Sequence, residues 1–475
     1  MYFRIALYPL LCLTAAFQAP EDSIQKHYRA AQELHGAGKT KEAESQYRVA
    51  LGEAYRNLGR ILLAQGEYQR AVRALDGAVA SGVVSEQTLI DLATAYFHAQ
   101  QYEKALDPLK RALASNPRSA AAHHMTGKVH FMLGQFDRAA SELETALRLS
   151  PADFDAAYTL ALARLKQKQV APARQIFTLL LRRLGSRAEV HNLFGRAYRE
   201  TGHFDEAIVE FKKAISLNPK HPRVHYNLGL SYLLKDGTLM LKEAGAEFRA
   251  ELATHPDEFL AVYNLGLVLV VESKYEEAAR LLEKAAQLRP QNPDVWLFLG
   301  NAYHGLRQFE RAIESLKKTM TLNPNLDKTS AHAEEAHFLL GQSLVRVGRM
   351  EEGEKELEIA RDLKAKSLAT DRERIVAYLK TEEYSGAQSL PGAGEKVLSV
   401  KYTPDPKLKK RLKDSETLYG GGVAKIHNQM GLLYAERQDF RAAAEHFRSA
   451  TDWDSRLPGA GYNLGLAYYR TGLFK

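Results

Sequence analysis

The chain has 475 residues, of which 45% are hydrophobic and 26% charged, and its formal net charge is +8. This hydrophobic content excludes a disordered chain, and the length suits either several ordinary domains or one elongated array of repeats. The 65 basic and 57 acidic residues are interspersed. That mixture argues against the concentrated basic surface of a nucleic-acid-binding protein.

Residues 1–19 differ in composition from the rest of the chain. Arg4 precedes an apolar run over residues 5–17, and small residues follow. This pattern is typical of a secretory signal peptide, and the run is too short to span a bilayer. A buried N-terminal helix is the alternative. We expect an exported protein, periplasmic or secreted, whose leader is cleaved or retained as an anchor and which has no other stable membrane insertion.

The only cysteine, Cys12, lies inside this leader. The mature chain is therefore expected to contain no thiol, which excludes thiol catalysis, disulfides and cysteine metal sites.

A repeated pattern dominates the sequence after the leader. Residues 294–325 contain two apolar stripes at helical spacing, a glycine and an alanine where two helices would approach each other, and a closing proline. The positions that carry this pattern are Trp296, Leu299, Gly300, Tyr303, Ala312, Leu316 and Pro324. The stretch resembles the tetratricopeptide repeat, a helical hairpin that buries its apolar stripe only by stacking on neighbouring copies.

The resemblance extends over most of the chain, and most copies are 34 residues apart. The copies begin near Ile24, Gly52, Glu86, Ala120, Phe154, Ala188, Pro222, Phe259, Pro293, Glu334, Ala424 and Pro458. The twelfth copy has only its first helix and turn, so we expect further sequence after Lys475. The resemblance implies an all-α fold, a right-handed superhelical solenoid of about eleven complete copies plus the partial twelfth.

Four segments follow from this register. They are a signal peptide at 1–19, an array of copies 1–10 at 24–366, a linker at 367–423 and the last copies at 424–475. The linker has two candidate helices, at 372–384 and, strongly basic, at 403–416; Tyr419–Gly422 would form a flexible entry to the eleventh copy. The basic helix is interpreted as a solvated face, with an anionic polymer as the alternative partner.

Departures from the repeat pattern mark local irregularities. The first copy is six residues short, the seventh has three extra residues in the turn at 234–242, and the ninth ends in an extra stretch at 326–332. Gly185 replaces the closing proline of the fifth copy, and Gly353 replaces the usual alanine of the tenth.

The sequence HGAGKT at residues 35–40 raises the question of nucleotide binding, because it matches the end of a phosphate-binding P-loop. A P-loop needs a glycine five residues before Gly38, where this chain has Glu33, and it follows a buried strand rather than a polar helical stretch. Aligned with the other copies, the stretch is the turn between the two helices of the first repeat. We therefore predict a helix-ending glycine at Gly38.

Catalytic motifs are not found in the sequence. It has no G-x-S-x-G turn and no H-E-x-x-H helix. The spacing of His123, His124 and His130, and that of His332 and His337, is poor for ligands on one helix face. We predict a protein that is not an enzyme, has no metal and no cofactor, and shows no small-molecule substrate.

The family resemblance implies that the first helices line an inner groove, with the fifth, ninth and twelfth positions of each copy facing it. In copies seven and eight these positions and their neighbours are apolar, whereas copy six has Asn192, Arg196 and Arg199. An apolar patch commonly marks a partner site, although the extra turn at 234–242 could bury it as core. The predicted partner-binding residues are Tyr226, Asn227, Leu230, Leu233, Leu234, Tyr263, Asn264, Leu267, Val270, Val271 and Asn301.

Asparagine occurs at the sixth position of several copies, as Asn57, Asn227, Asn264 and Asn463. Superhelical family members hold a peptide backbone with an asparagine ladder at this position, because the amide both donates and accepts hydrogen bonds. The intervening residues Asp91, Met125, Thr159 and Leu193 interrupt the ladder.

The predicted function is a scaffold that binds a protein or peptide, as an extended segment or helix, in its groove. The resemblance leaves an alternative, the substrate-recruiting arm of a larger enzyme such as a glycosyltransferase whose catalytic domain follows residue 475.

Overall fold

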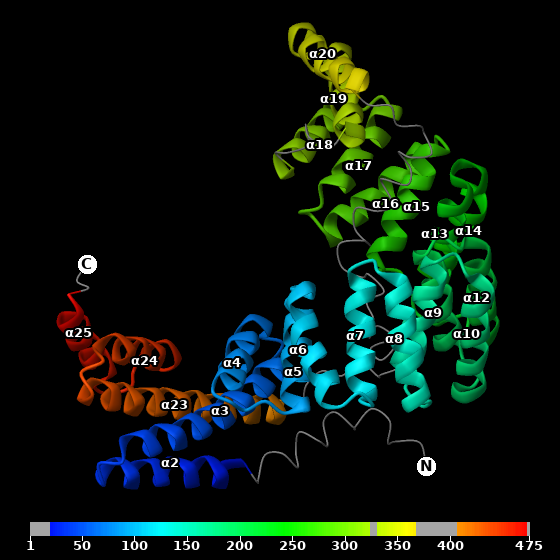
Figure 1. Ribbon diagram of the computed structural model, residues 1–475. Coiled ribbons are helices and arrows are strands. Elements are labelled where there is room, and N and C mark those ends of the chain that lie inside the picture. Colours follow the sequence, from blue (N-terminus) through cyan, green and yellow to red (C-terminus); the bar gives the residue numbers. More distant parts are fainter. Residues whose placement is uncertain (1–19, 324–329, 367–405, 473–475) are drawn as a thin grey trace. The chain divides into compact units, whose positions relative to one another are not determined.

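A computed structural model describes residues 20–323, 330–366 and 406–472 of the chain (Figure 1). These residues form helices joined by turns, with no strand among them. The chain divides into two compact units. The first unit comprises residues 1–167 and 399–475, and the second comprises residues 168–398. The boundary falls between the two helices of the fifth copy.

The first unit contains the first four copies, the first helix of the fifth copy, and the C-terminal copies. Its helices are α2 (Pro20–Gly36), α3 (Thr40–Gln65), α4 (Tyr68–Ala80), α5 (Glu86–His98), α6 (Tyr102–Ser115), α7 (Ala120–Met132), α8 (Phe136–Leu149), α9 (Phe154–Lys166), α23 (Pro406–Glu436), α24 (Phe440–Trp453) and α25 (Ala460–Thr471). Consecutive helices pack as hairpins, and the first helices α3, α5, α7 and α9 also contact one another in order.

The second unit continues the same alternation. Its helices are α10 (Val170–Leu184), α11 (Ala188–Glu200), α12 (Phe204–Leu217), α13 (Val224–Asp236), the 3-10 turn η1 (Gly237–Met240), α14 (Leu241–Thr254), α15 (Phe259–Val271), α16 (Tyr275–Leu288), α17 (Pro293–Gly305), α18 (Phe309–Leu322), α19 (Ser330–Arg346) and α20 (Met350–Lys366). The all-α fold of stacked antiparallel hairpins is confirmed.

The turn inside most hairpins contains one residue in the left-handed conformation. In the first copy this residue is Gly38, with φ +73°, and the N–H of Lys39 donates to the carbonyl of Leu34 at 2.9 Å. This arrangement satisfies a carbonyl at the end of α2. The prediction that residues 35–40 form a repeat turn is confirmed. Gln100, with φ +61°, shows that a residue other than glycine takes the same position in the third copy.

The shortened first copy produces a long helix rather than a truncated one. Its second helix and the first helix of copy two join into the 26 residues of α3. No proline interrupts this stretch, so the helix continues through Gly52. A side chain at Gly52 would place its Cβ 2.4 Å from Val83 Cγ2, so glycine there lets the chain before α5 pack against α3.

The expected flexible entry at Tyr419–Gly422 is wrong. These residues lie inside α23, which runs without a break from the basic segment into the first helix of copy eleven. Tyr419 and Val423 are buried on either side of the three glycines. Three successive glycines are unfavourable in a helix, and this burial compensates for that cost.

The other irregular copies keep the hairpin by local adjustments. The extra residues of copy seven form η1 between α13 and α14. Gly185 ends α10 with φ +80°. A Cβ at Gly353 would lie 2.8 Å from the carbonyl oxygen of Gly341, so the glycine permits the close approach of α19 and α20.

The glycine of the repeat pattern marks a close helix contact. A Cβ at Gly300 would lie 2.6 Å from Leu316 Cγ. We therefore expect Gly300→Leu to destabilise the second unit by about 1–3 kcal/mol through overpacking, measured by urea unfolding. Gly461→Leu is the control, because nothing lies within 4 Å of a Cβ there. Equal losses from both variants would contradict the packing argument.

The predicted leader at 1–19, the candidate helix at 372–384 and the linker before residue 406 lie outside the described residues. Within the described part of the chain, every helix is too short or too polar to cross a membrane.

Candidate partner-binding residues of the repeats

The predicted apolar patch of copies seven and eight is buried. Six of its apolar side chains are at most 7% exposed, namely Tyr226, Leu230, Leu233, Tyr263, Leu267 and Val270. Leu234 and Asn301 are half-buried, and Val271 is 41% exposed. The expectation of an exposed apolar surface at these positions is therefore wrong. Helix α15 is apolar around nearly its whole circumference, which is the pattern of a buried helix.

Aromatic contacts hold the two tyrosines of this region. The ring of Tyr226 lies 5.8 Å from that of Phe248, and the Arg223 guanidinium lies 5.2 Å from the Tyr226 ring. The ring of Tyr263 lies 5.9 Å from that of Phe298. These side chains therefore pack within the second unit.

The asparagines of copies seven and nine bond to neighbouring copies. Asn227 donates to Asn192 Oδ1 at 2.9 Å and accepts from Arg199 Nη1 at 2.9 Å, and all three residues are buried. Asn301 donates to Glu335 Oε1 at 2.6 Å. Both side chains therefore form rungs between repeats.

A spacing rule for these rungs was missed at the sequence level. The sixth-position asparagine pairs with the fifth position of the preceding copy, 35 residues earlier, in Asn192–Asn227 and again in Asn428–Asn463. Copy eight follows the same rule with Tyr226 and Asn264, which are 38 residues apart because of the three-residue insertion. The available signal was this spacing of one repeat plus one residue.

Four sixth-position residues keep a buried polar atom that has no hydrogen-bond partner in the described part of the chain. Three lie in the first unit, at Asn57 Nδ2, Asp91 Oδ2 and Thr159 Oγ1, and the fourth is Asn264 Oδ1 in the second unit. Asp91 Oδ2 lies 3.6 Å from Arg60 Nε, too far for a hydrogen bond. Burial raises the pKa of Asp91. Such atoms are uncommon in folded proteins, where nearly all buried polar groups are paired.

We call Asn57, Asp91, Met125 and Thr159 the sixth-position row. They lie on α3, α5, α7 and α9, which contact one another in order. Asp91 and Thr159, expected as interruptions of an asparagine ladder, thus carry unsatisfied polar groups as Asn57 does, with the apolar Met125 between them.

A charged cluster lies beside this row, between α7 and α9. His124 is 3.0 Å from Asp153 Oδ2 and 3.1 Å from Asp155 Oδ2, and Lys128 Nζ donates to Asp155 Oδ2 at 2.8 Å. Burial alone lowers the pKa of His124, but its bonds to the two carboxylates outweigh burial and raise that pKa to about 9. Burial raises the pKa of Asp155, yet His124 and Lys128 hold it well below its usual range.

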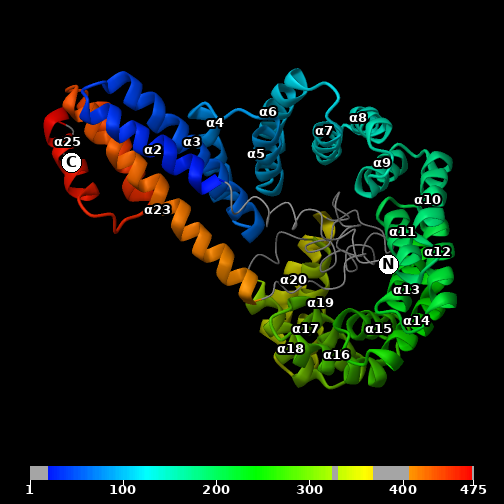
Figure 2. The same ribbon diagram turned by 90° about the horizontal axis from the view of Figure 1, so that it is seen from below.

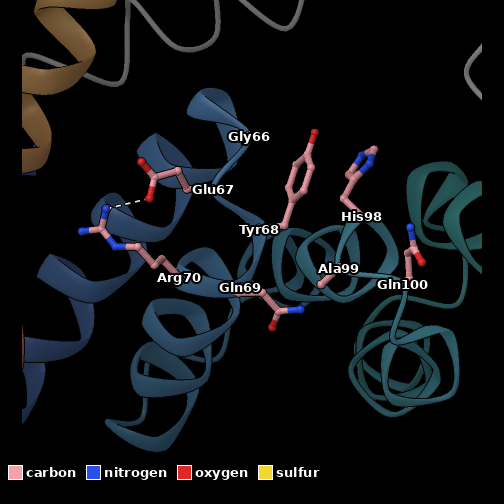
Figure 3. A pocket seen from close by; sticks show the side chains of 8 residues that line it. All are labelled: Gly66, Glu67, Tyr68, Gln69, Arg70, His98, Ala99 and Gln100. Atoms are coloured by element: carbon pink, nitrogen blue, oxygen red, sulfur yellow. Dashed lines mark hydrogen bonds and ion pairs between the residues drawn. The ribbon is translucent and has the colours of Figure 1, made fainter. Parts of the chain in front are cut away.

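A shallow pocket of about 370 Å³ lies between the turns of copies two and three (Figure 3). Tyr68 and His98 stack on one side with ring centres 4.8 Å apart. Arg70 is paired with Glu67 and with Glu416 of α23, each at 2.7 Å. The charges of Arg70 and Glu67 thus neutralise each other, and the pocket brings together no nucleophile with a general base.

The other candidate histidines do not converge on a common point. His130 bonds Gln135 at 2.8 Å, and His332 lies 3.8 Å from Asp294. Within residues 20–323, 330–366 and 406–472, no group of three or more histidine, cysteine, aspartate or glutamate side chains is placed to hold a metal ion.

Stacked helical hairpins with polar rungs define a helical-repeat protein. Family models described as tetratricopeptide repeat match residues 56–120, 90–140, 130–196, 241–293 and 269–333, and a model described as TPR repeat matches residues 195–236. The chain belongs to the tetratricopeptide repeat family.

Curated relatives are similar at low identity. Protein CTR9 homolog of Arabidopsis thaliana is 24% identical over 88% of this chain, which spans 34% of that protein. BBSome complex member BBS4 of Mus musculus is 23% identical, covering 82% of this chain and 72% of its own length. Protein O-mannosyl-transferase TMTC1 of Homo sapiens is 25% identical over 51% of this chain and 23% of its own length.

One of the solved structures to which the chain is similar is MamA 41-end from Desulfovibrio magneticus RS-1. It is 24% identical with a TM-score of 0.33, and the match covers 38% of this chain and 97% of that one.

Proposed function

We propose that the chain is a protein-interaction scaffold that binds an extended peptide along the sixth-position row of its first unit. The observation that carries the proposal is the row of polar atoms at Asn57, Asp91 and Thr159 without hydrogen-bond partners. These atoms are buried in the free chain, so the peptide binds only when the side chains that cover the row move aside. A peptide main chain offers both donors and acceptors, so it satisfies an amide, a carboxylate and a hydroxyl alike. Membership of the repeat family and similarity to a BBSome complex member support an interaction role.

Removal of one polar atom from this row tests the proposal. Thr159→Val keeps the shape of the side chain and removes a buried hydroxyl that has no partner. We expect stability to be unchanged or higher, because an unsatisfied group is lost, while a linear peptide selected by phage display against the full chain binds about 3–10-fold more weakly. Fluorescence anisotropy measures the affinity, and thermal unfolding measures the stability.

Thr126→Val is the matched control, since that buried hydroxyl already donates to the carbonyl of Ala122 at 2.7 Å. It should leave peptide affinity unchanged. If Thr159→Val lowers stability and leaves affinity as in the wild type, the row has a structural role and the proposal fails.

We also propose a separate contact region in the second unit, at those predicted residues of copies seven to nine that are not fully buried, Leu234, Val271 and Asn301. The leader predicted at residues 1–19 supports our proposal that the scaffold acts outside the cytoplasm, in the periplasm or after secretion.

Similarity to an O-mannosyl-transferase favours one alternative, that these repeats recruit substrates for a larger enzyme. The match covers 23% of that protein, so the alternative depends on family resemblance. A folded domain without repeats after Lys475 would favour it over the scaffold.

A further inference from the structure

The C-terminal repeat packs onto the N-terminal repeats within the first unit. Helix α23 lies antiparallel along α3, as both views show (Figures 1 and 2), with Glu44 close to Arg437 and Gln65 close to Glu416. Both helices contribute to one hydrophobic core. The buried members from α23 are Leu412, Tyr419, Val423, Ile426, Met430 and Leu433, and those from α3 include Leu51, Tyr55, Leu58, Ile61 and Leu62.

This contact covers an end of the array that would otherwise expose an apolar face. Terminal repeats of a solenoid have no neighbour on one side, so they need a cap. Here the cap is a hairpin, α23–α24, that comes from more than 350 positions later in the chain, as the 372-residue separation of Tyr55 and His427 shows. We call this contact the closure.

A chain of hydrogen bonds crosses the closure. Trp453 Nε1 donates to Tyr55 Oη at 3.0 Å, and Tyr55 Oη lies 2.7 Å from His427 Nε2. His427 Nδ1 lies 2.8 Å from His446 Nδ1. One donor order satisfies every atom: Tyr55 donates to His427 Nε2, and His427 Nδ1–H donates to His446 Nδ1. In this order both imidazoles are neutral.

The surrounding charges come from each packed helix. From α3, Glu44 accepts from Tyr434 Oη at 2.7 Å and from Arg437 at 2.6 Å, and Arg48 donates to Tyr434 Oη at 3.1 Å. The Tyr434 ring stacks on His446 with centres 5.2 Å apart. On α2, His35 pairs with Glu436 at 2.7 Å, and on α24 Asp452 adds a negative charge near Tyr55.

Equivalent positions in other copies have a different partner for the histidine. In copies one, four, six, seven, ten and eleven the fourth residue is a histidine, which pairs with a residue of the second helix 19 positions later, or 22 in copy seven. The pairs with an acidic partner are His123–Glu142, His191–Glu210 and His225–Glu247 at 2.6 Å and His337–Glu356 at 2.5 Å. Copy one has His27–Gln46 at 2.7 Å. Copy eleven instead pairs His427 with a second histidine, His446.

We propose that the closure is reversible and that protonation of the His427–His446 pair releases it. A second proton on His427 removes the acceptor for Tyr55, and a second proton on His446 sets two N–H groups facing each other. Each proton thus breaks one hydrogen bond of the series that crosses the closure, and it adds a charge to a buried contact. In the His–Glu copies the same proton would strengthen an ion pair.

The pKa values of both histidines agree in direction with this geometry. Burial and the neighbouring His446 lower the pKa of His427 to about 3, and burial and Arg48 lower that of His446 to about 4. The closed form thus binds fewer protons than the open form, so closure is complete above the ordinary histidine pKa of about 6.5 and weakens as pH falls. With two protons, the closure constant at pH 5 is about a thousandfold lower than at pH 8.

Glu44 acts in a separate window. Its hydrogen bonds to Tyr434, Arg437 and Arg48 outweigh burial and hold its pKa at about 2. Its contribution to closure is therefore full above the ordinary pKa of about 4.5 and is lost only below it. Release that begins between pH 6.5 and pH 5 is thus due to the histidines.

Trp453 reports the closure directly. The chain has two tryptophans, so the full chain with Trp296→Phe has Trp453 as its only tryptophan. We expect its emission to shift to longer wavelength as pH falls from about 8 to about 5, with a slope of two protons, while far-ultraviolet circular dichroism shows that the helices remain. An emission that stays constant over this range, or that changes only together with a loss of helix, overturns the proposal.

His446→Gln is the matched variant, because it recreates the pair of copy one, in which His27 bonds to Gln46. We expect closure at pH 8 as in the parent protein, release with a slope of one proton, and about 30-fold less release at pH 5. His427→Gln should give the same slope independently. If both variants still release with a slope of two protons, as in the parent protein, the proposed role of the histidine pair is overturned. His191→Gln, in the second unit, should change nothing at Trp453.

Discussion

Asp155→Ala is expected to destabilise the first unit by about 3–5 kcal/mol, because it removes a buried carboxylate that two largely buried cations share. Asp155 is 4% exposed, and it lies between His124 and Lys128 in the first turn of α9, where the helix dipole also favours a negative charge. Urea unfolding of the full chain measures the loss, and hydrogen exchange of α7 and α9 shows where it occurs.

Asp107→Ala is the control, since that side chain is 76% exposed and lies 3.9 Å from Arg111. We expect a change below about 1 kcal/mol there. The raised pKa of His124 gives a second test. Its ionised form stabilises the native state fully below about pH 6.5, and this contribution is lost as pH rises through 9. Asp155→Ala should weaken this alkaline loss; an unchanged alkaline loss would contradict the ion-pair argument.

Phe211→Ala is expected to destabilise the second unit by about 3–5 kcal/mol through a cavity in the packed hairpin. Phe211 is fully buried, and its ring lies against Gly195, where an added Cβ would come within 2.6 Å of Cε1. The glycine and the ring therefore fit each other, so the backbone has little room to collapse into the space. Urea unfolding measures the loss, and hydrogen exchange should localise it to α11, α12 and their neighbours.

Val209→Ala on the same helix is the control, because Val209 is 50% exposed. It should change stability by about 0.5 kcal/mol at most. A loss from Phe211→Ala no larger than that of the control would show that the hairpin repacks around the cavity.

The hairpin register could be predicted from sequence because it depends on local pattern. The turn at Gly38, the close contact at Gly300 and the helix end at Gly185 each follow from a residue type at a fixed place in the repeat. The continuous α3 and α23 could not be predicted in the same way. Whether a helix continues through Gly52 or through Gly420–Gly422 depends on burial against distant segments, which local propensity does not contain.

The candidate site was harder to predict because the amino-acid type does not specify exposure. An apolar run such as α15 is compatible with an open binding face or with a buried helix, and the structure shows burial. Conversely, Asp91 and Thr159 differ chemically from asparagine, yet they share with Asn57 a buried polar atom without a partner. That property depends on neighbouring helices and is invisible in one repeat alone.

The amino-acid sequence by itself determined the repeat family, the positions of most hairpins and the residues of their turns, because these depend on contacts within about 34 neighbouring residues. Only the tertiary structure decided that His427 pairs with His446 rather than an acid, and that this pair bonds to Tyr55 of a helix 372 positions earlier. The physical reason is that the stacking surfaces of different repeats resemble one another. Packing over the whole unit, rather than the local pattern, therefore decides which repeats become neighbours.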